Sequence, residues 1–536
     1  MDVTRNSLSE PEDQMVAPVT PAVASLAAAG AVLLTGGCTV ANTGHGGYDP
    51  NTLRLVISQE PPTLEPCESS LTSTGIVVRS NITEPLIERD PTTGDLQPLL
   101  STGWRQDAPD RWTFAIRSGV TFSNGAPFTA ADAAFAIDRA VNSDLGCNVD
   151  GYVFGDEKLE LATPDDATLT VTTEKPDPIL PLRISFVEIV PRGTSTTEKV
   201  REPIGTGPYA IAGWDYGQKL TLSRNERYWG PKPAFARAEY QWRSEGSVRA
   251  AMVTNDETDI ATGLGPEDGA GQLGVEFPNN ETTALRIACT DAPLDDIRVR
   301  QAINYTVNRN GIVKALFRGM GQPAAQLIPD GVVGHNSDLT PWPHDIEKAK
   351  QLVAEAKAAG VPVDRQIRLI GRTAQFPNIS ETMEVIQSEL TEIGLNPRIE
   401  MMDTAGQLQY QLRPFPVGAG PFVAMIQHGN QAGDAAFSVD QYMRTDGAQS
   451  SCGTAAFDRK IEAAGQLTGA RRQDAYATLF AEEPTEVAQF AYVAHMTGIL
   501  GKSPRVEYTP NSATGDEMRL AEMTKAGNGS DQSDRS

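Results

Sequence analysis

Hydrophobic and polar residues alternate over short stretches in the first half of the chain, as in strands with one buried face. Trp112–Arg117 shows this alternation, and Leu53–Ser58 is a short apolar run before two prolines. Further strand-like pieces follow at Leu169–Thr172, Leu220–Ser223 and Tyr240–Arg243. We expect helices over Ile76–Leu86 and after a capping box of Thr129 and Asp132. This half is therefore predicted to be mostly β.

From about residue 290 the pattern changes to an alternation of helices and strands. Asp345 is placed to cap a helix that Gly360 ends, and another helix lies within Pro293–Leu316. A strand, a helix and a strand then follow at Ile367–Gly371, Ser380–Ile393 and Leu395–Met402. This order predicts a parallel sheet, because parallel strands need a crossover connection. A mixed-β half followed by an α/β half indicates two lobes.

One stretch near the N-terminus is apolar enough to interact with a membrane. Ala22–Gly37 is apolar and uncharged and ends at Cys38; it is short for a transmembrane helix and suits a signal peptide. Leu33–Cys38 resembles a bacterial lipobox, although Thr35 stands where leucine is usual. We expect residues 1–37 to be a signal peptide, Cys38 to be lipidated and residues 38–52 to form a flexible tether. The alternative is a buried helix that ends in a loop cysteine.

The other four cysteines contain no CxxC pair, so a zinc site is not expected. Four thiols allow three disulfide connectivities. Cys67 and Cys147 lie in one half of the chain, and Cys289 and Cys452 in the other. We expect a Cys67–Cys147 disulfide and regard the second pair as open; the alternative is four unpaired buried thiols.

The composition limits the classes of function. The 536 residues predict about three structural units, at roughly 150 residues each. A formal charge of −24, without a basic stripe, argues against nucleic acid as a partner. The sequence has no GxSxG, HExxH or Walker lysine motif, and its five histidines show no ligand spacing. We therefore expect no enzymatic activity, no cofactor and no metal site.

Several segments together resemble one protein family. The longest, Asp110–Asp132, reads DRWTFAIRSGVTFSNGAPFTAAD. The others, in order, are Ser58–Pro66, Ile204–Ile211, Arg224–Gly230, Asp296–Arg309 and Asp345–Ala356. They resemble the oligopeptide/dipeptide-binding family (solute-binding family 5), the extracytoplasmic substrate-binding proteins of ABC importers. The resemblance extends from residue 53 to about 525.

The resemblance implies an α/β fold, the two-lobe periplasmic-binding-protein fold (type II, large cluster), with an extra β-rich subdomain in the first lobe. Residues 53–285 would form lobe I, with 84–200 as the extra subdomain, and residues 286–490 would form lobe II. Residues 491–525 would return to lobe I, and 526–536 would be a disordered tail.

The implied function is capture of short peptides between the lobes and delivery to membrane permease subunits, by a monomer anchored to the cell membrane on its outer side. In the family, a Gly-Trp segment of the second lobe supplies an aspartate for the peptide ammonium. The matching segment here, His428–Asp434, contains Gly429, has Asn430 in place of Trp and carries the acid one residue later. Asp434 is therefore a candidate anchor, and the alternative is that it caps a helix.

Four further residues are candidates for ligand contact. Glu60 follows the entry strand where the family touches ligand, although it could be a solvated turn acid. Arg372 follows a predicted parallel strand, at the end where such sheets bind ligands, with Gln375 as a weaker neighbour. Trp242 also lies at a strand end, but a tryptophan in such a position is more often part of the core than of a binding pocket. Arg372 could hold a ligand carboxylate or form a structural ion pair.

Two other kinds of function stay open. The same fold could bind a non-peptide solute, such as glutathione, haem, a nickel chelate or a sugar. A secreted hydrolase or a sensory lipoprotein without a transport role is the alternative from another class.

Overall fold

The structure, a computed structural model, describes residues 49–527 except 70–71, 156, 269–270, 374, 431 and 511–517. The predicted signal peptide, Cys38 and nearly all of the predicted tether lie outside the described residues, as do residues 528–536 of the predicted tail. Within the described part of the chain, none of the helices has the length and apolar character needed to cross a membrane.

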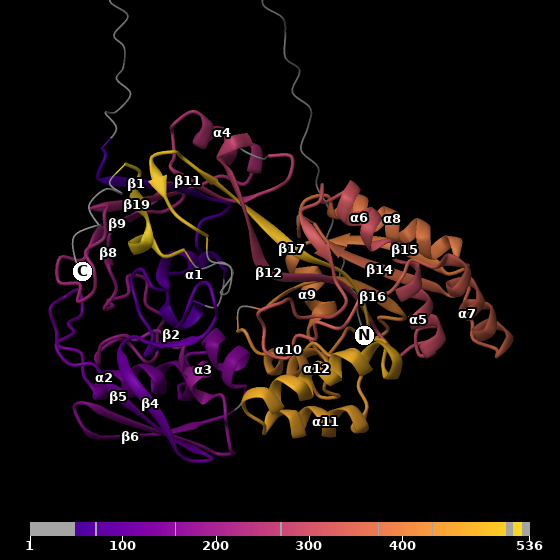
Figure 1. Cartoon of the computed structure of the whole chain (residues 1–536), viewed down its shortest axis with the longest axis horizontal. Helices are drawn as coiled ribbons and strands as arrows, with labels where there is room; N and C mark the ends of the chain where they lie inside the picture. Colours follow the sequence, from indigo (N-terminus) through magenta and orange to yellow (C-terminus); the bar gives the residue numbers. More distant parts are fainter. Residues whose placement is uncertain are drawn as a thin grey trace, which may run out of the picture. The chain divides into compact units, whose positions relative to one another are not determined.

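An eleven-stranded sheet forms the framework of both lobes (Figure 1). Its second-lobe strands are, in order, β15 (Asn396–Met402), β14 (Gln366–Arg372), β16 (Phe422–Gly429), β12 (Gly274–Ile287) and β17 (Phe490–Lys502), with β13 (Gly321–Pro323) beside β17. Its first-lobe strands continue as β11 (Ile260–Leu264), β1 (Thr52–Ile57), β10 (Arg237–Trp242), β9 (Lys219–Arg224) and β8 (Tyr209–Asp215). β14 is parallel to β15, which confirms the predicted β-α-β unit.

Two long strands, β12 and β17, run between the lobes (Figure 1). The first part of β12 pairs with the end of β17, which also pairs with β11 of the first lobe. The last part of β12 pairs with β16 of the second lobe. Between them, the register of β12 against β17 shifts at Pro278/Thr282. β12 and β17 thus contact strands of both lobes on either side of this register shift, and the boundary at 285 stays a prediction.

Helices cover both faces of the second-lobe sheet. Those on one face are α5 (Ile297–Thr306), α7 (Ile346–Ala358) and α8 (Ile379–Glu392), and those on the other are α10 (Ala435–Tyr442), α11 (Ala455–Gly465) and α12 (Gly469–Glu486). Successive strand residues point to opposite faces, so Leu285 packs in one core and Ala284 in the other. The remaining helices of this lobe are α6 (Arg309–Ala315) and α9 (Thr404–Gln411).

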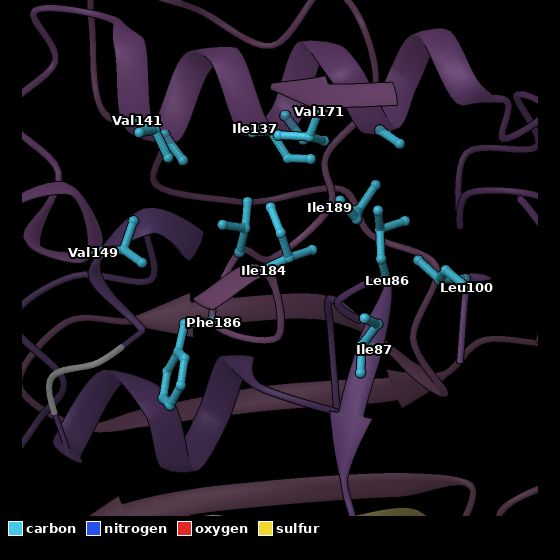
Figure 2. Packing of buried hydrophobic residues seen from close by; sticks show 14 of the residues in the cluster. Leu86, Ile87, Leu100, Ile137, Val141, Val149, Val171, Ile184, Phe186 and Ile189 are labelled. Carbon is cyan, nitrogen blue, oxygen red and sulfur yellow. The ribbon is translucent and has the colours of Figure 1, made fainter. Parts of the chain in front are cut away.

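The first lobe carries a separate β-rich region within the predicted subdomain. Its four-stranded antiparallel sheet has the order β4 (Ser101–Ala108), β5 (Arg111–Ile116), β7 (Thr168–Thr173), β6 (Leu159–Asp165), and β2 (Ile87–Arg89) pairs with β3 (Leu96–Pro98). Helices α2 (Ala130–Ile137) and α3 (Leu180–Ile184) pack on it. Figure 2 shows Ile137, Val171 and Ile189 converging in this core. The predicted capping box at Thr129 and Asp132 is present at the start of α2.

The last described segment of the chain packs on the first lobe. Met518, Leu520 and Met523 pack in the same core as Leu53 of β1. Two short strands, β18 (Val506–Glu507) and β19 (Thr524–Lys525), pair with each other nearby.

One helix prediction was wrong in its extent, and one expected helix is followed by a second. The helix expected over Ile76–Leu86 is α1 (Thr72–Val78), which ends because Ser80 adopts a left-handed φ of 58° and Asn81 donates its amide to the carbonyl oxygen of Ile76. The Pro293–Leu316 stretch holds two helices, α5 and α6. Extended backbone at Val307 separates them, and the Asn308 side chain caps α6.

Both cysteine pairs are joined. Cys67 and Cys147 form a disulfide with a Cα–Cα distance of 5.3 Å, and Cys289 and Cys452 form the second, which the sequence left open, at the same Cα–Cα distance. The alternative of four unpaired thiols does not apply to this structure.

Candidate ligand-binding site

A cavity of about 820 Å³ lies beside the strands that connect the lobes. Its walls come from the end of β1, helix α4 (Gly246–Thr254), β11, β12, β16, β17 and the loop before α8. Residues of both lobes therefore line one space, and this space borders the register shift in β12. Its size is within the range of small-molecule sites.

One wall of the cavity is apolar. Phe317 and Phe376 meet edge to face with ring centroids 5.6 Å apart. Phe277 and Met320 add further apolar surface. Such a wall holds hydrophobic parts of a guest without fixing their orientation.

Polar side chains line the cavity where β12 begins to pair with β16 of the second lobe. The carboxylate of Glu281 accepts hydrogen bonds from the amides of Asn279 and Gln427, both at 2.7 Å. Gln375, from the loop before α8, donates its amide to the carbonyl oxygen of Met425 at 3.3 Å. Its Oε1 is buried and accepts no hydrogen bond from the residues that the structure describes. All four polar side chains line the cavity.

The charge of the described lining is mainly negative. It contains the carboxylates of Glu245, Asp268 and Glu281 and the guanidinium of Arg249. That guanidinium is used internally, because it donates to four backbone carbonyl oxygens at 2.6–3.0 Å, those of Arg243, Ser244, Thr262 and Gly263. Burial lowers the pKa of Arg249, which neighbouring Asp268 and Glu245 partly offset.

A glycine allows one of these acids to approach the chain. The carboxylate of Asp268 accepts a hydrogen bond from the amide of Gly265 at 2.9 Å. A Cβ atom at Gly246 would lie 1.9 Å from Oδ2 of Asp268. Only glycine at the start of α4 leaves room for this carboxylate.

Of the residues predicted from the sequence, Gln375 lines the cavity. The other six are not among the described lining residues: Glu60, Trp242, Arg372, Gly429, Asn430 and Asp434. Arg372 is the last residue of β14, at the predicted strand end. Gly429 pairs with Glu281 across the sheet and so lies beside the cavity rather than in it.

Asp434 occupies a structural position. It is the N-cap of α10 and accepts a hydrogen bond from the amide of Ala436 at 2.9 Å. Both its carboxylate oxygens also bind Arg472 at 2.7 Å, and the two side chains are 3% and 4% exposed. The N-cap position that the helix-capping alternative expects is thus confirmed, whereas the anchor role stays a prediction for a carboxylate that has a buried cation as its partner.

Three other candidates also have structural partners. Asn430 is buried and donates to the carbonyl oxygen of Asn280 at 3.1 Å. Glu60 accepts hydrogen bonds from Trp214 at 2.9 Å and from the Gly217 amide. Trp242 packs against the first-lobe core, as its core alternative predicted.

Sequence reasoning missed Glu281, Asn279 and Gln427. The available signal was an acid and an amide inside a stretch that otherwise reads as a strand, Gly274–Ile287. Within the described chain, no group of three or more His, Cys, Asp and Glu side chains is arranged to hold a metal ion.

Residues 95–450 match the family model of bacterial extracellular solute-binding proteins, family 5. The chain belongs to this family. Among curated relatives, it is 27% identical over 347 residues to the dipeptide-binding protein of Escherichia coli, covering 59% of this chain and 65% of that protein. It is 28% identical over 309 residues to the glutathione-binding protein GsiB of Salmonella typhi, covering 55% of this chain and 59% of that protein. The matches thus span less than two thirds of these relatives' lengths.

Solved structures of similar fold cover most of the chain. A periplasmic binding protein DppA from Helicobacter pylori, in complex with the peptide STSA, has a TM-score of 0.76 at 19% identity, covering 88% of this chain and 98% of that one. The substrate-binding protein CtaP from Listeria monocytogenes has a TM-score of 0.77 at 19% identity, covering 88% and 99%. The two-lobe α/β fold expected from the sequence is confirmed.

Proposed function

We propose that this protein is an extracytoplasmic solute-binding protein that captures short peptides and delivers them unchanged, as a monomer, to the permease subunits of an ABC importer. The observation that carries this proposal is the cavity of about 820 Å³ lined by both lobes, in a chain of family 5. Its relatives include a dipeptide-binding and a glutathione-binding protein, which supports a peptide-like guest.

The cavity has the properties that a peptide of variable sequence requires. Its apolar residues bury hydrophobic side chains of a guest according to their surface area, while its amide and carboxylate groups bind peptide backbone or charged groups. A guest that contacts residues of both lobes would favour the closed arrangement of the lobes, because it binds that arrangement more tightly than the open one.

Native mass spectrometry of the purified protein tests the proposal. We expect bound peptides of mixed sequence, which organic solvent releases with their masses unchanged. A single defined non-peptide species would contradict the peptide assignment, and a covalently altered guest would contradict a transport role.

A non-peptide solute is the second candidate. It is favoured by one observation: Asp434, at the position where the resemblance implies an ammonium anchor, is paired with Arg472. The same mass spectrometry separates this candidate from the first.

Membrane attachment through a lipid on Cys38 completes the proposal. It is supported by the lipobox-like segment that ends at this cysteine. Cys38→Ser is expected to move the protein from the membrane fraction to the soluble fraction on cell fractionation, while the wild type stays in the membrane fraction. Continued retention of the Cys38→Ser protein would exclude acylation at this residue.

A further inference from the structure

The polar wall of the cavity is rich in hydrogen-bond acceptors. Glu281 presents a carboxylate, and Gln375 presents an Oε1 that is buried and accepts no hydrogen bond from the described residues. The two groups come from different elements, β12 and the loop before α8, and line the same space.

The orientation of both groups is set by neighbouring backbone and amides. Asn279 and Gln427 each donate to Oε2 of Glu281 at 2.7 Å. Gln375 is held through its nitrogen, which donates to the carbonyl oxygen of Met425 at 3.3 Å, so its oxygen is directed elsewhere. Preorganised acceptors of this kind favour a guest that brings several donors on one charged atom or group.

The cationic side chain in the described lining does not offset this preference. The guanidinium of Arg249 donates to four backbone carbonyl oxygens of its own lobe. Asp268 and Glu245 add negative charge to the cavity lining. A guest carboxylate would meet carboxylates in this space, whereas a guest cation would be attracted.

We propose that Glu281 and Gln375 form the recognition site for a cationic N–H donor of the solute, an ammonium or a guanidinium group. This inference rests on the proposed function and names the chemistry of the guest. The ammonium can come from a peptide N-terminus or from a lysine-like side chain, and the two sources share the same donors.

Calorimetric titration of the full chain with three probes tests this site. The probes are tri-alanine, N-acetyl-tri-alanine, and N-acetyl-Ala-Lys-Ala amide, whose ammonium is on the side chain. We expect the wild type to bind at least one ammonium-bearing probe tenfold or more tighter than N-acetyl-tri-alanine. Preference for tri-alanine alone identifies the N-terminus as the source, and preference for the lysine probe identifies the side chain.

Substitution assigns the preference to the site. Glu281→Gln is expected to reduce the tenfold preference to less than threefold, whereas Glu276→Gln, an exposed acid on the same strand, leaves it unchanged. Gln375→Met, which removes Oε1 at similar volume, is expected to reduce it severalfold. This second variant carries the test if circular dichroism shows that Glu281→Gln does not fold.

Two results are distinguishable as failures. If the wild type binds the probes equally, or if both variants keep the full preference, the cation site is wrong and the proposed function stands. If none of the three probes binds to the folded wild type, the proposed peptide-binding function is wrong, and the proposed cation site is wrong as well.

Discussion

At the scale of single residues, two buried carboxylates of this protein form ion pairs with arginines that lie far away in sequence. Glu65 and Arg139 form an ion pair at 2.7 Å with both side chains at most 2% exposed. Asp434 and Arg472 also form a buried ion pair at 2.7 Å, and Asp434 is at the same time the N-cap of α10. A carboxylate that is both a cap and an ion-pair partner is constrained by the fold before any ligand is considered.

Asp434→Ala is therefore expected to destabilise the fold, by about 3–5 kcal/mol, because it leaves the buried Arg472 without its carboxylate partner. Urea denaturation followed by circular dichroism measures the loss. Glu347→Ala is the control, since its ion pair with Lys350 is exposed on both sides and its removal is expected to leave the midpoint almost unchanged. An unaltered midpoint for Asp434→Ala would show that the buried pair does not stabilise the fold.

At the scale of elements, long-range links hold the β-rich region to the rest of the first lobe. The disulfide between Cys67 and Cys147 joins residues separated by 80 positions in sequence. The ion pair between Glu65 and Arg139 lies on the same two segments. Both links connect the chain before α1 to the residues that follow α2.

Replacing Cys67 and Cys147 together by Ala is expected to lower the free energy of unfolding by about 4 kcal/mol, because the unfolded chain regains the entropy of an open loop. The loop closed by Cys289 and Cys452 is longer, with a separation of 163, so the corresponding double variant is expected to lose slightly more, by under about 1 kcal/mol. Equilibrium denaturation of both variants measures this. Wild-type stability in the first variant would refute the contribution of that disulfide.

At the scale of the whole molecule, each lobe contains a buried carboxyl group with a strongly raised pKa. Burial raises the pKa of Glu84, in the first lobe, to about 7, although Trp229, Thr206 and Tyr228 donate hydrogen bonds to it. Burial likewise raises the pKa of Glu483, in the second lobe, to about 7. The folded protein thus binds these protons more tightly than the unfolded chain does.

The sign of the effect follows from these raised pKa values. The contribution of Glu84 to the free energy of unfolding is fully present below its unfolded pKa of 4.5 and is lost as the pH rises towards 7. We expect Glu84→Gln to become more stable relative to the wild type over this range, by up to about 3 kcal/mol at 1.36 kcal/mol per pKa unit. Comparing variant and wild type is necessary because His428 and His495, whose pKa values burial lowers to about 4, act in the opposite direction.

Denaturant midpoints at several pH values between 4.5 and 7.5 measure this difference, with Glu483→Gln as the equivalent in the other lobe. A stability difference between Glu84→Gln and the wild type that does not change with pH would show that Glu84 is already ionised in the folded state.

Local sequence pattern was sufficient where a neighbour in sequence decides the conformation. Asp345 accepts the hydrogen bond of the Lys348 amide as a helix cap should, and the strand after Pro362 and the helix after Asn378 lie where their periodicity predicts them. Such features depend on contacts within a few residues. Family membership likewise followed from short motifs in order along the chain.

The cavity was decided by tertiary structure. Gln375 was identifiable because it follows a parallel strand. Glu281 was not, because the side chain that orients its carboxylate, Gln427, is 146 residues away in sequence and is brought beside it by the pairing of β12 with β16. Asp434 was an ambiguous acid until Arg472, 38 residues later, was placed against it. The sequence by itself thus determined the elements and the family. The pairing of strands across the sheet determined which polar groups face the guest, because a shift of one residue in strand register moves every side chain to the opposite face of the sheet.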